Sequence, residues 1–371
     1  MRVTAVTLRD FRNYERAELA LGERLTVVTG PNGAGKTNLL EAIYFGCTAR
    51  SPRTSTERDL IRHGQHVARV TVTSEDGAGG SHLIEVGFAP GEQRSMRVDG
   101  AAVDNLSSAR ERPLVSVFMP ERLELVKGGP SLRRAHLDHL IAALWPGRAV
   151  TRAAYGRALS QRNALLARIR AGTASSSSLG SWDLELARNG AELMCDRQAV
   201  VELVAPLFAR RAGELGLPEE GELSYRPRSR SRDAAGLAAE LRERRDADLE
   251  RGFTAHGPHR DDLYLVHGGR PLRTFGSQGQ QRIALLALLF AERDVLAAER
   301  GGAPLMLLDD VMSELDPERR ALLAELLRSE GQGMVTTADL GQVPGTGEDD
   351  VVVVEVAAGA LTTAAAAAGR R

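Results

Sequence analysis

The sequence predicts an α/β fold, in which a parallel sheet carries a phosphate-binding loop and a helical second lobe interrupts the sheet. Three observations support this prediction. A glycine-rich loop joins a short apolar run to a helix near the N-terminus, within TVVTGPNGAGKTNLLEAIYF at residues 26–45. Arginine- and leucine-rich runs with helical spacing fill the middle of the chain, and apolar runs typical of buried strands return from Leu305 onward. With 371 residues, 43% of them hydrophobic, the chain can form two compact lobes.

The N-terminal part, up to about Met119, is predicted to consist mainly of β-strands around one helix. ARVTVTS, HLIEVGFA and SMRVDGAAV are separated by glycine and acidic turns. Leu25–Thr29 is short and β-branched, as in a buried strand, and Asn38–Phe45 opens a helix. The glycine-rich loop therefore lies between a strand and a helix, which is the position that a P-loop requires.

This loop contains the groups that phosphate binding needs. Its glycines let the backbone turn N–H groups toward phosphate oxygens, and the N-terminus of the helix adds a favourable dipole. Lys36 would reach the β- and γ-phosphates, and the Thr37 hydroxyl would hold Mg²⁺. We therefore predict a nucleotide site made of Gly30, Pro31, Asn32, Gly33, Ala34, Gly35, Lys36, Thr37 and Asn38.

The middle of the chain is predicted to be helical from Ser131 to about Leu217. Apolar positions such as Tyr155, Leu159 and Leu166 recur at helical intervals. The small-residue connector AGTASSSSLGS separates the two longest runs. We expect them to form a short antiparallel helical hairpin with arms of roughly 40 Å each.

The sheet is predicted to resume after this helical part. A helical run from Ala234 to Glu250 and the strand-like DDLYLVHGG precede a helix predicted from Ser277 to Ala298. APLMLLDD, GMVTTAD and DVVVVEV are typical of strands buried inside a parallel sheet. The tail LTTAAAAAGRR has low complexity, and we expect it to fray.

Two adjacent acids, Asp309 and Asp310, end the apolar run Leu305–Leu308. Open α/β sheets bind ligands at the carboxyl ends of their strands. Asp309 could complete the Mg²⁺ shell begun by Thr37, and Asp310 could orient and polarise an attacking water. The alternative is a solvated strand end, but a P-loop nucleotide needs a Mg²⁺-binding acid and favours the functional interpretation.

A second candidate anion site lies in FGSQGQQR, directly before a predicted helix. The Ser277 hydroxyl and the N–H groups of Gly279 and Gln280 would face an anion at the helix N-terminus. Taken alone, the motif favours an ordinary serine N-cap. The order of motifs favours the anion site, because a P-loop, a helical insertion, a Ser-x-Gly-Gln turn and an acid-terminated strand follow one another in ABC-type ATPase heads.

At this point the chain resembles the RecF proteins of bacterial DNA repair. The matching blocks follow the family order over nearly the whole chain: LRDFRNY at 8–14, GPNGAGKTNLLEAIY at 30–44, RTSTERDLIRHG at 53–64, MPERLELVKGGPSLRR at 119–134, GPHRDDL at 257–263, SQGQQR at 277–282 and LLDDVMSELD at 307–316.

The resemblance implies an ATP-dependent homodimer that holds two ATP molecules with Mg²⁺. Each ATP would contact the P-loop of one subunit and Ser277 and Gly279 of the other, with Lys36, Ser277 and Asp310 as the catalytic set. Asp310 stands where ABC transporters have a glutamate, and its shorter side chain disfavours fast hydrolysis. The resemblance therefore implies a weak, DNA-dependent ATPase. Arg12 and Asn13 match the family's early loop beside the nucleotide, although they could merely end an edge strand.

The resemblance also implies DNA binding at single-strand gaps or junctions, and assistance to RecO and RecR in loading RecA. Replication-fork maintenance and SOS induction would depend on this activity. The implied division is ATPase lobe I at 1–118, a helical lobe II at 119–299 and the rest of lobe I, with a frayed tail, at 300–371. The short hairpin excludes the long coiled coil of chromosome-organising ATPases.

DNA contacts would have to come from local patches of charge. The formal net charge is -1, so the chain as a whole does not attract nucleic acid, and 4% aromatic residues disfavour base stacking as the main source of affinity. Any single arginine is better explained as part of a solvated face. The candidate phosphate contacts are Arg53, Arg58, Arg62, Arg228, Arg230 and Arg232.

Two other functions remain open at this level, the ATPase subunit of a membrane transporter and a small-molecule kinase. A kinase has no use for a Ser277 anion site that faces a second subunit. No run approaches the roughly 18 apolar residues needed to cross a bilayer, and the N-terminus lacks an apolar signal core. We expect a cytoplasmic protein with no membrane partner, in which Cys47 and Cys195 both pack in the interior.

Overall fold

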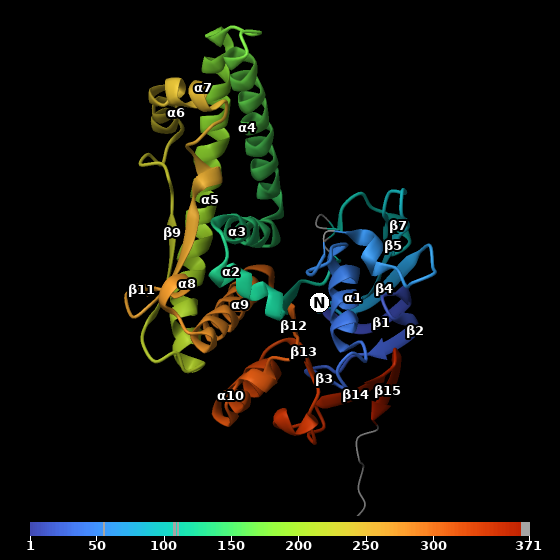
Figure 1. The fold of residues 1–371 in the computed structure, drawn as a ribbon. Coiled ribbons are helices and arrows are strands. Elements are labelled where there is room, and N and C mark those ends of the chain that lie inside the picture. Colours follow the sequence, from blue (N-terminus) through green and yellow to red (C-terminus); the bar gives the residue numbers. More distant parts are fainter. Residues whose placement is uncertain (55, 107–108, 110, 365–371) are drawn as a thin grey trace, which may run out of the picture. The chain divides into compact units, whose positions relative to one another are not determined.

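The computed structural model describes residues 1–54, 56–106, 109 and 111–364. The chain forms two compact units (Figure 1). Unit 1 comprises Met1–Arg122, Glu214–Gly216 and Arg293–Arg371, and unit 2 comprises Leu123–Gly213 and Leu217–Glu292. The division into lobes at 118 and 299 stays a prediction.

Within its described residues, unit 1 contains two six-stranded sheets. The first is antiparallel, in the order β2-β1-β4-β5-β6-β7. Its strands are β1 (Arg2–Phe11), β2 (Tyr14–Ala20), β4 (Ala68–Glu75), β5 (Ser81–Phe88), β6 (Ser95–Val98) and β7 (Ala101–Ala102). Buried and exposed residues alternate along β4, so one face of this sheet packs on the core and the other faces outward.

The second sheet has the order β15-β14-β3-β13-β12-β8, with parallel pairing from β14 to β8. Its strands are β3 (Leu25–Thr29), β8 (Val115–Phe118), β12 (Leu305–Leu308), β13 (Gln332–Thr337), β14 (Val351–Ala357) and β15 (Ala360–Ala364). The predicted parallel sheet is therefore confirmed. The unbroken burial of β12 and β13 explains why their sequences are apolar without alternation.

Helix α1 (Lys36–Thr48) packs against strands of both sheets in the core of unit 1 (Figure 1). Its side chains Leu39, Leu40 and Ile43 are fully buried. Gly46 permits a close approach to β4, because a Cβ there would lie 2.5 Å from Cγ2 of Val72. Unit 1 also contains η1 (Glu57–Leu60), η3 (Pro120–Leu123), η7 (Met312–Glu314), α10 (Pro317–Ser329) and η8 (Leu340–Gln342).

The C-terminal tail differs in part from the prediction that it frays. Leu361 and Thr363 lie in β15, where they pair with Val356 and Val354 of β14. Ladder hydrogen bonds to a buried strand outweigh the low complexity of this segment. The rest of the predicted frayed tail, residues 365–371, lies outside the described residues.

Unit 2 is mainly helical. Its helices are α2 (Glu124–Lys127), α3 (Pro130–Leu144), η4 (Pro146–Arg148), α4 (Ala149–Arg170), η5 (Ser176–Ser178), α5 (Leu179–Glu214), α6 (Ala234–Glu243), α7 (Arg245–Arg251), η6 (Pro258–Arg260), α8 (Leu272–Phe275) and α9 (Gln278–Arg300), whose C-terminal end belongs to unit 1. A small antiparallel sheet has the order β11-β10-β9, from β9 (Gly221–Arg226), β10 (Asp262–His267) and β11 (Arg270–Pro271).

The hairpin of α4 and α5 corrects the prediction of two arms of equal length. The helices have 22 and 36 residues, or about 33 Å and about 54 Å at 1.5 Å per residue. Helix α5 starts inside the predicted connector because Leu179 is buried there. The arms are joined by the fully buried Arg162, which donates to Asp183 across 2.8 Å. Cys195 corrects another prediction, since it is exposed on α5, whereas Cys47 is buried in α1.

Candidate nucleotide-binding site

The glycine-rich loop lies between β3 and α1, as predicted. Gly30, Gly33 and Gly35 have φ angles of 148°, 79° and 118°, in the region that disfavours other residues. A Cβ on Gly30 would lie 2.2 Å from the carbonyl oxygen of Val356, and one on Gly35 would lie 2.5 Å from Nδ2 of Asn13. Both the backbone conformation and the close packing therefore require glycine at these two positions.

Lys36, the first residue of α1, turns its ammonium group back into the loop. Nζ donates to the carbonyl oxygens of Gly30 at 2.6 Å and Pro31 at 3.1 Å. The side chain is held inside the curve of the loop, with 8% of the residue exposed. A phosphate bound in the loop would thus meet both a full positive charge and the N-terminus of a 13-residue helix.

Thr37 and Asp309, which are far apart in sequence, meet at the edge of the parallel sheet. The Thr37 hydroxyl donates to Oδ2 of Asp309 at 2.8 Å, and Thr336 on β13 donates to Oδ1 at 2.7 Å. Burial raises the pKa of the Asp309 carboxyl, and the two hydroxyl hydrogen bonds partly offset this effect. A buried carboxylate next to a hydroxyl is a donor set that suits a hard divalent cation such as Mg²⁺.

Asp310 differs from its neighbour because it is exposed and has a φ angle of 47°. Its backbone N–H donates to the hydroxyl oxygen of Thr336 at 2.9 Å, and this bond fixes the turn after β12. Aspartate tolerates the left-handed conformation better than most residues. The turn separates the two carboxylates, so that Asp309 is buried and Asp310 faces solvent.

The loop between β1 and β2 braces the P-loop from outside. Asn13 donates through Nδ2 to the carbonyl oxygen of Ala34 at 3.0 Å and accepts from Nδ2 of Asn38 at 2.9 Å. The Tyr14 hydroxyl donates to the carbonyl oxygen of Gly35 at 2.9 Å. Asn13 was predicted to lie beside the nucleotide. In the structure its side chain is hydrogen-bonded to the P-loop. Tyr14 had no predicted role.

Arg12 is placed differently from its neighbour Asn13. Its guanidinium makes two hydrogen bonds of 2.9 Å to Glu41, a fully buried acid in the middle of α1. Ser51 and Arg53 also donate to Glu41, at 2.6 Å and 3.2 Å. Sequence reasoning missed Glu41, although a single acid in the apolar run LLEAIYF was a usable signal. Arg12 and Arg53 neutralise this acid directly behind the P-loop.

Ser277 begins α9 with a reciprocal capping box in unit 2. Its hydroxyl accepts from the backbone N–H of Gln280 at 3.2 Å, and its own N–H donates to Oε1 of Gln280 at 2.8 Å. Ser277 and Gly279 are exposed, and the neighbouring Phe275 ring is 63% exposed. The predicted second anion site thus has a capped helix N-terminus and an open surface.

The candidate DNA contacts fall into two groups. In unit 1, Arg53 binds Glu41, and Arg62 donates to Asp10 at 2.9 Å. Both are held by carboxylates, whereas Arg58 is exposed.

In unit 2, the loop that carries Arg228, Arg230 and Arg232 is held by two acids. Asp261 accepts from the N–H of Arg228 at 2.6 Å, and Glu240 accepts from the N–H of Arg230 at 3.0 Å. All three arginines are exposed. Because the carboxylates bind the backbone rather than the guanidinium groups, the loop is ordered and its side chains face solvent.

Comparison with known proteins identifies the family. Residues 2–360 match the family model described as the RecF/RecN/SMC N terminal domain. The DNA replication and repair protein RecF of Myxococcus xanthus (strain DK1622) is 40% identical over 365 residues, which cover 95% of this chain and 94% of that relative. The chain belongs to the RecF family.

Solved structures agree with this assignment. The recombination mediator protein RecF, solved with ATP in the RecFOR pathway, is 28% identical to this RecF-family chain, covers 98% of both chains and has a TM-score of 0.87. An Smc head domain from Pyrococcus furiosus, at 17% identity, covers 98% of this chain and 96% of its own with a TM-score of 0.59, which shows the likeness of fold. The predicted ABC-type head fold and RecF family are confirmed, and the family is one of DNA replication and repair rather than of transport.

Among the residues that the structure describes, no helix combines the length and the apolar character needed to cross a membrane.

Proposed function

We propose that this RecF-family chain is an ATP-dependent DNA-binding protein of recombinational gap repair. It dimerises on ATP, hydrolyses ATP slowly in a DNA-dependent way, and acts in the cytoplasm beside RecO and RecR to load RecA. Support for ATP and for these partners comes from the related RecF solved with ATP in the RecFOR pathway. Replication-fork maintenance and SOS induction follow from this role.

The observation that carries the proposal is the contact between Thr37 and Asp309. Their hydrogen bond of 2.8 Å joins the first turn of α1 to the end of β12, directly behind the P-loop. The hydroxyl and the carboxylate would hold Mg²⁺ between them, and Lys36 with the loop N–H groups would hold the phosphates. A bound Mg²⁺ would neutralise charge on the phosphates. These residues fit ATP and Mg²⁺, because Lys36 places a cation inside the loop and Asp309 places a carboxylate beside the Thr37 hydroxyl.

Asp310 is our candidate for orienting and polarising the attacking water. It is exposed, and the rigid turn at Thr336 holds its backbone beside the buried Asp309. An aspartate side chain is one methylene group shorter than a glutamate side chain, so it holds the attacking water less closely to the phosphate. We therefore expect turnover to be slow, as suits a switch rather than a motor.

Ser277, Gly279 and Gln280 are proposed to complete the site of a second subunit. The capping box leaves the hydroxyl proton of Ser277 available to an acceptor, because that oxygen only accepts in the cap. The turn is open to a partner, because Ser277, Gly279 and the neighbouring Phe275 are all exposed. The site would then require a head-to-tail dimer.

For DNA we propose the ordered arginine loop of unit 2, with Arg228, Arg230 and Arg232 as phosphate contacts. Guanidinium groups on a loop that is already fixed lose less entropy on binding. Arg12 and Arg53 are proposed to act through Glu41, by holding the helix behind the phosphates.

The test is DNA binding by the full chain to single-stranded, duplex and gapped DNA of equal length, with and without ATP and Mg²⁺. We expect ATP to tighten binding to the gapped or single-stranded substrate and to convert monomer to dimer in sedimentation. The Lys36→Ala variant is the matched control and should not respond to ATP. If ATP changes neither the affinity nor the sedimentation of the unaltered chain, the proposal is wrong.

A further inference from the structure

The outward face of the antiparallel sheet in unit 1 carries a row of arginines. Arg9 on β1 lies opposite Arg16 on β2 and opposite Arg69 on β4. All three are exposed, while the adjacent Leu8 and Val70 are buried on the other face. Three guanidinium groups therefore stand side by side across three neighbouring strands, directed away from the core.

This row costs stability, and among the described residues only Arg9 of the three has a carboxylate within ion-pair distance. Glu18, exposed two residues after Arg16 on β2, lies on the same face. Like charges directly opposite one another destabilise a sheet. The carboxylate nearest to Arg9 is that of Asp10, at 3.9 Å, and Asp10 is already bound by Arg62 at 2.9 Å. Within the described part of the chain, neither Arg16 nor Arg69 has a carboxylate within ion-pair distance. Packing does not explain the row, but an anionic ligand would.

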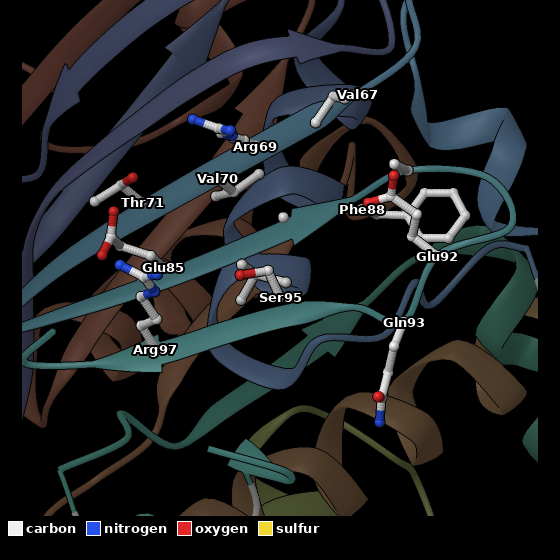
Figure 2. Close-up of a pocket in the computed structure, with 13 residues that line it drawn as sticks. Val67, Arg69, Val70, Thr71, Glu85, Phe88, Glu92, Gln93, Ser95 and Arg97 are labelled. Carbon is white, nitrogen blue, oxygen red and sulfur yellow. The ribbon is translucent and has the colours of Figure 1, made fainter. Parts of the chain in front are cut away.

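The row leads into a hollow on the same face. Gly87 on β5 lies opposite Arg69, and Ser95 on β6 lies opposite Gly87. A cavity of about 300 Å³ opens over these strands, with Thr71 and Arg97 also in its lining (Figure 2). A glycine inside a strand often marks the close approach of a ligand.

Packing does not require glycine at this position. A Cβ on Gly87 would lie 3.7 Å from Cβ of Ser95 and 3.8 Å from Cγ of Arg69, which are ordinary contact distances. The φ angle is not positive either. Gly87 keeps the hollow open without being needed by the backbone.

Acidic residues limit where an anion could lie. Glu85 is the cross-strand partner of Arg97, and Glu92 is at the rim of the hollow (Figure 2). The charge of Arg97 is thus offset, and the net positive charge lies at the Arg69 end. An anion would approach along the row rather than from the side of Glu92.

We propose that Arg16, Arg9, Arg69 and the hollow over Gly87, together called the sheet strip, bind the phosphate backbone of DNA. This rests on the proposed function and adds a second contact surface, in unit 1. With strands about 4.8 Å apart, the strip from β2 to β5 is about 14 Å long. Several consecutive phosphates fit along it, because one strand of a duplex has a phosphate about every 3.4 Å of its axis. Guanidinium forks match phosphate oxygens in pairs.

The test is a salt titration of DNA affinity with the full chain, ATP and a fluorescent gapped DNA. The double variant Arg9→Gln/Arg69→Gln removes two charges and keeps side-chain length. We expect about a tenfold loss of affinity and a decrease of about two in the slope of log affinity against log salt, since each lost phosphate contact lowers the slope by about 0.9. The matched control is Arg157→Gln/Arg168→Gln, which removes two exposed arginines from α4.

A second variant tests the hollow without changing charge. Gly87→Leu would fill it, and we expect about a threefold loss of DNA affinity with unchanged ATP binding, since a close backbone approach is blocked. Gly87→Ser is the small-side-chain control and should bind nearly as well as the unaltered chain. Thermal unfolding separates this effect from misfolding, because a side chain in place of a strand glycine should not lower stability.

Unchanged affinity and slope in Arg9→Gln/Arg69→Gln, while the unaltered chain binds DNA with ATP, would overturn the sheet strip and leave the proposed function standing. Unchanged DNA affinity and slope are also expected if the sheet strip binds an acidic protein segment instead of DNA. Equal losses in the α4 control would mean that general charge, and not this surface, sets the affinity. If the unaltered chain does not bind DNA, both proposals fail.

Discussion

Two turns in this chain are proposed to receive phosphate, and they are built differently. The loop before α1 has three glycines with positive φ and an almost buried lysine, Lys36. The turn before α9 has its two glycines, Gly276 and Gly279, outside the positive-φ region, and its polar groups are exposed. The first turn surrounds its ligand site, whereas the second only offers a surface.

This difference indicates what each turn can do alone. The P-loop has its cation, its acid at Asp309 and its brace at Asn13 and Tyr14 within one unit, so it should bind ATP in a monomer. In the Ser277 turn the N–H groups of Ser277 and Gln280 are already bonded within the capping box, so the turn should bind phosphate only when another surface presents it. Substitutions in the first turn should therefore abolish binding, and those in the second should spare binding and affect assembly.

The largest effect is expected for Lys36→Ala. Removal of the only cation inside the loop should weaken ATP binding about a hundredfold or more, because charge-assisted contacts to phosphate contribute about 1.5–3 kcal/mol each and this lysine makes more than one. Isothermal titration with ATP and Mg²⁺ measures this loss. Arg24→Ala, a change at an exposed cation before β3, is the control. An affinity within threefold of the unaltered chain would contradict the assignment of the P-loop.

Asp310→Asn should separate binding from turnover. The amide cannot polarise water as a carboxylate does, so we expect ATP hydrolysis to fall about a hundredfold while ATP affinity stays unchanged. The closed dimer should accumulate on DNA. Single-turnover hydrolysis with a binding titration measures both quantities. Normal turnover would mean that another group activates the water.

Ser277→Arg should spare the P-loop and disrupt assembly. A large cation at the α9 surface blocks close approach of a second subunit, so ATP-driven dimerisation should weaken about tenfold or more. ATP binding by the monomer should be unchanged. Analytical ultracentrifugation at several protein concentrations measures the dimer constant. Equal dimerisation by this variant would show that α9 lies outside the interface.

The smallest effect is expected for Gln280→Glu. Glutamate keeps the acceptor of the capping box, so the free energy of unfolding should change by less than about 0.5 kcal/mol. A new negative charge near a partner's phosphate should nevertheless weaken ATP-driven dimerisation about threefold. Gln280→Ala is the control, because it loses the cap without adding charge. If both variants dimerise alike, Gln280 has only a capping role.

The sequence predicted well those features that local pattern determines. The strands ending at Thr29 and Leu308, the glycine loop and the pairing of Thr37 with Asp309 were all expected, because apolar runs and motif spacing define them. Glu41 was missed although its place in an apolar run was a signal. Its partners Arg12 and Arg53 could not be assigned to it, since they come from separate loops that only the folded sheet brings together.

Side-chain direction was predictable only in part. Arg12 matches a family motif, but its guanidinium binds an acid that the motif does not contain. The exposure of Cys195 depends on which face of α5 turns toward the interior. Met194 and Asp196 are buried on that face, and Cys195 therefore points to solvent. The arginine row at Arg9 needed strand register, which a sequence does not determine without the paired strand.

The central claim is that one active site takes its P-loop from one subunit and Ser277 from the other. A mixture of Ser277→Arg and Asp310→Asn chains tests it most directly, since each homodimer should be inactive. A heterodimer has one intact composite site and one that is doubly damaged. At protein concentrations far above the weakened dimer constant of the Ser277→Arg chain, pairing is close to random and should restore roughly a quarter of the sites of the unaltered protein. Phosphate release and ATP-dependent DNA release are followed together, because coupled sites could lower the first. Recovery of activity near this level is the predicted result, and activity no higher than that of the two parents, with heterodimers confirmed, would contradict the shared site.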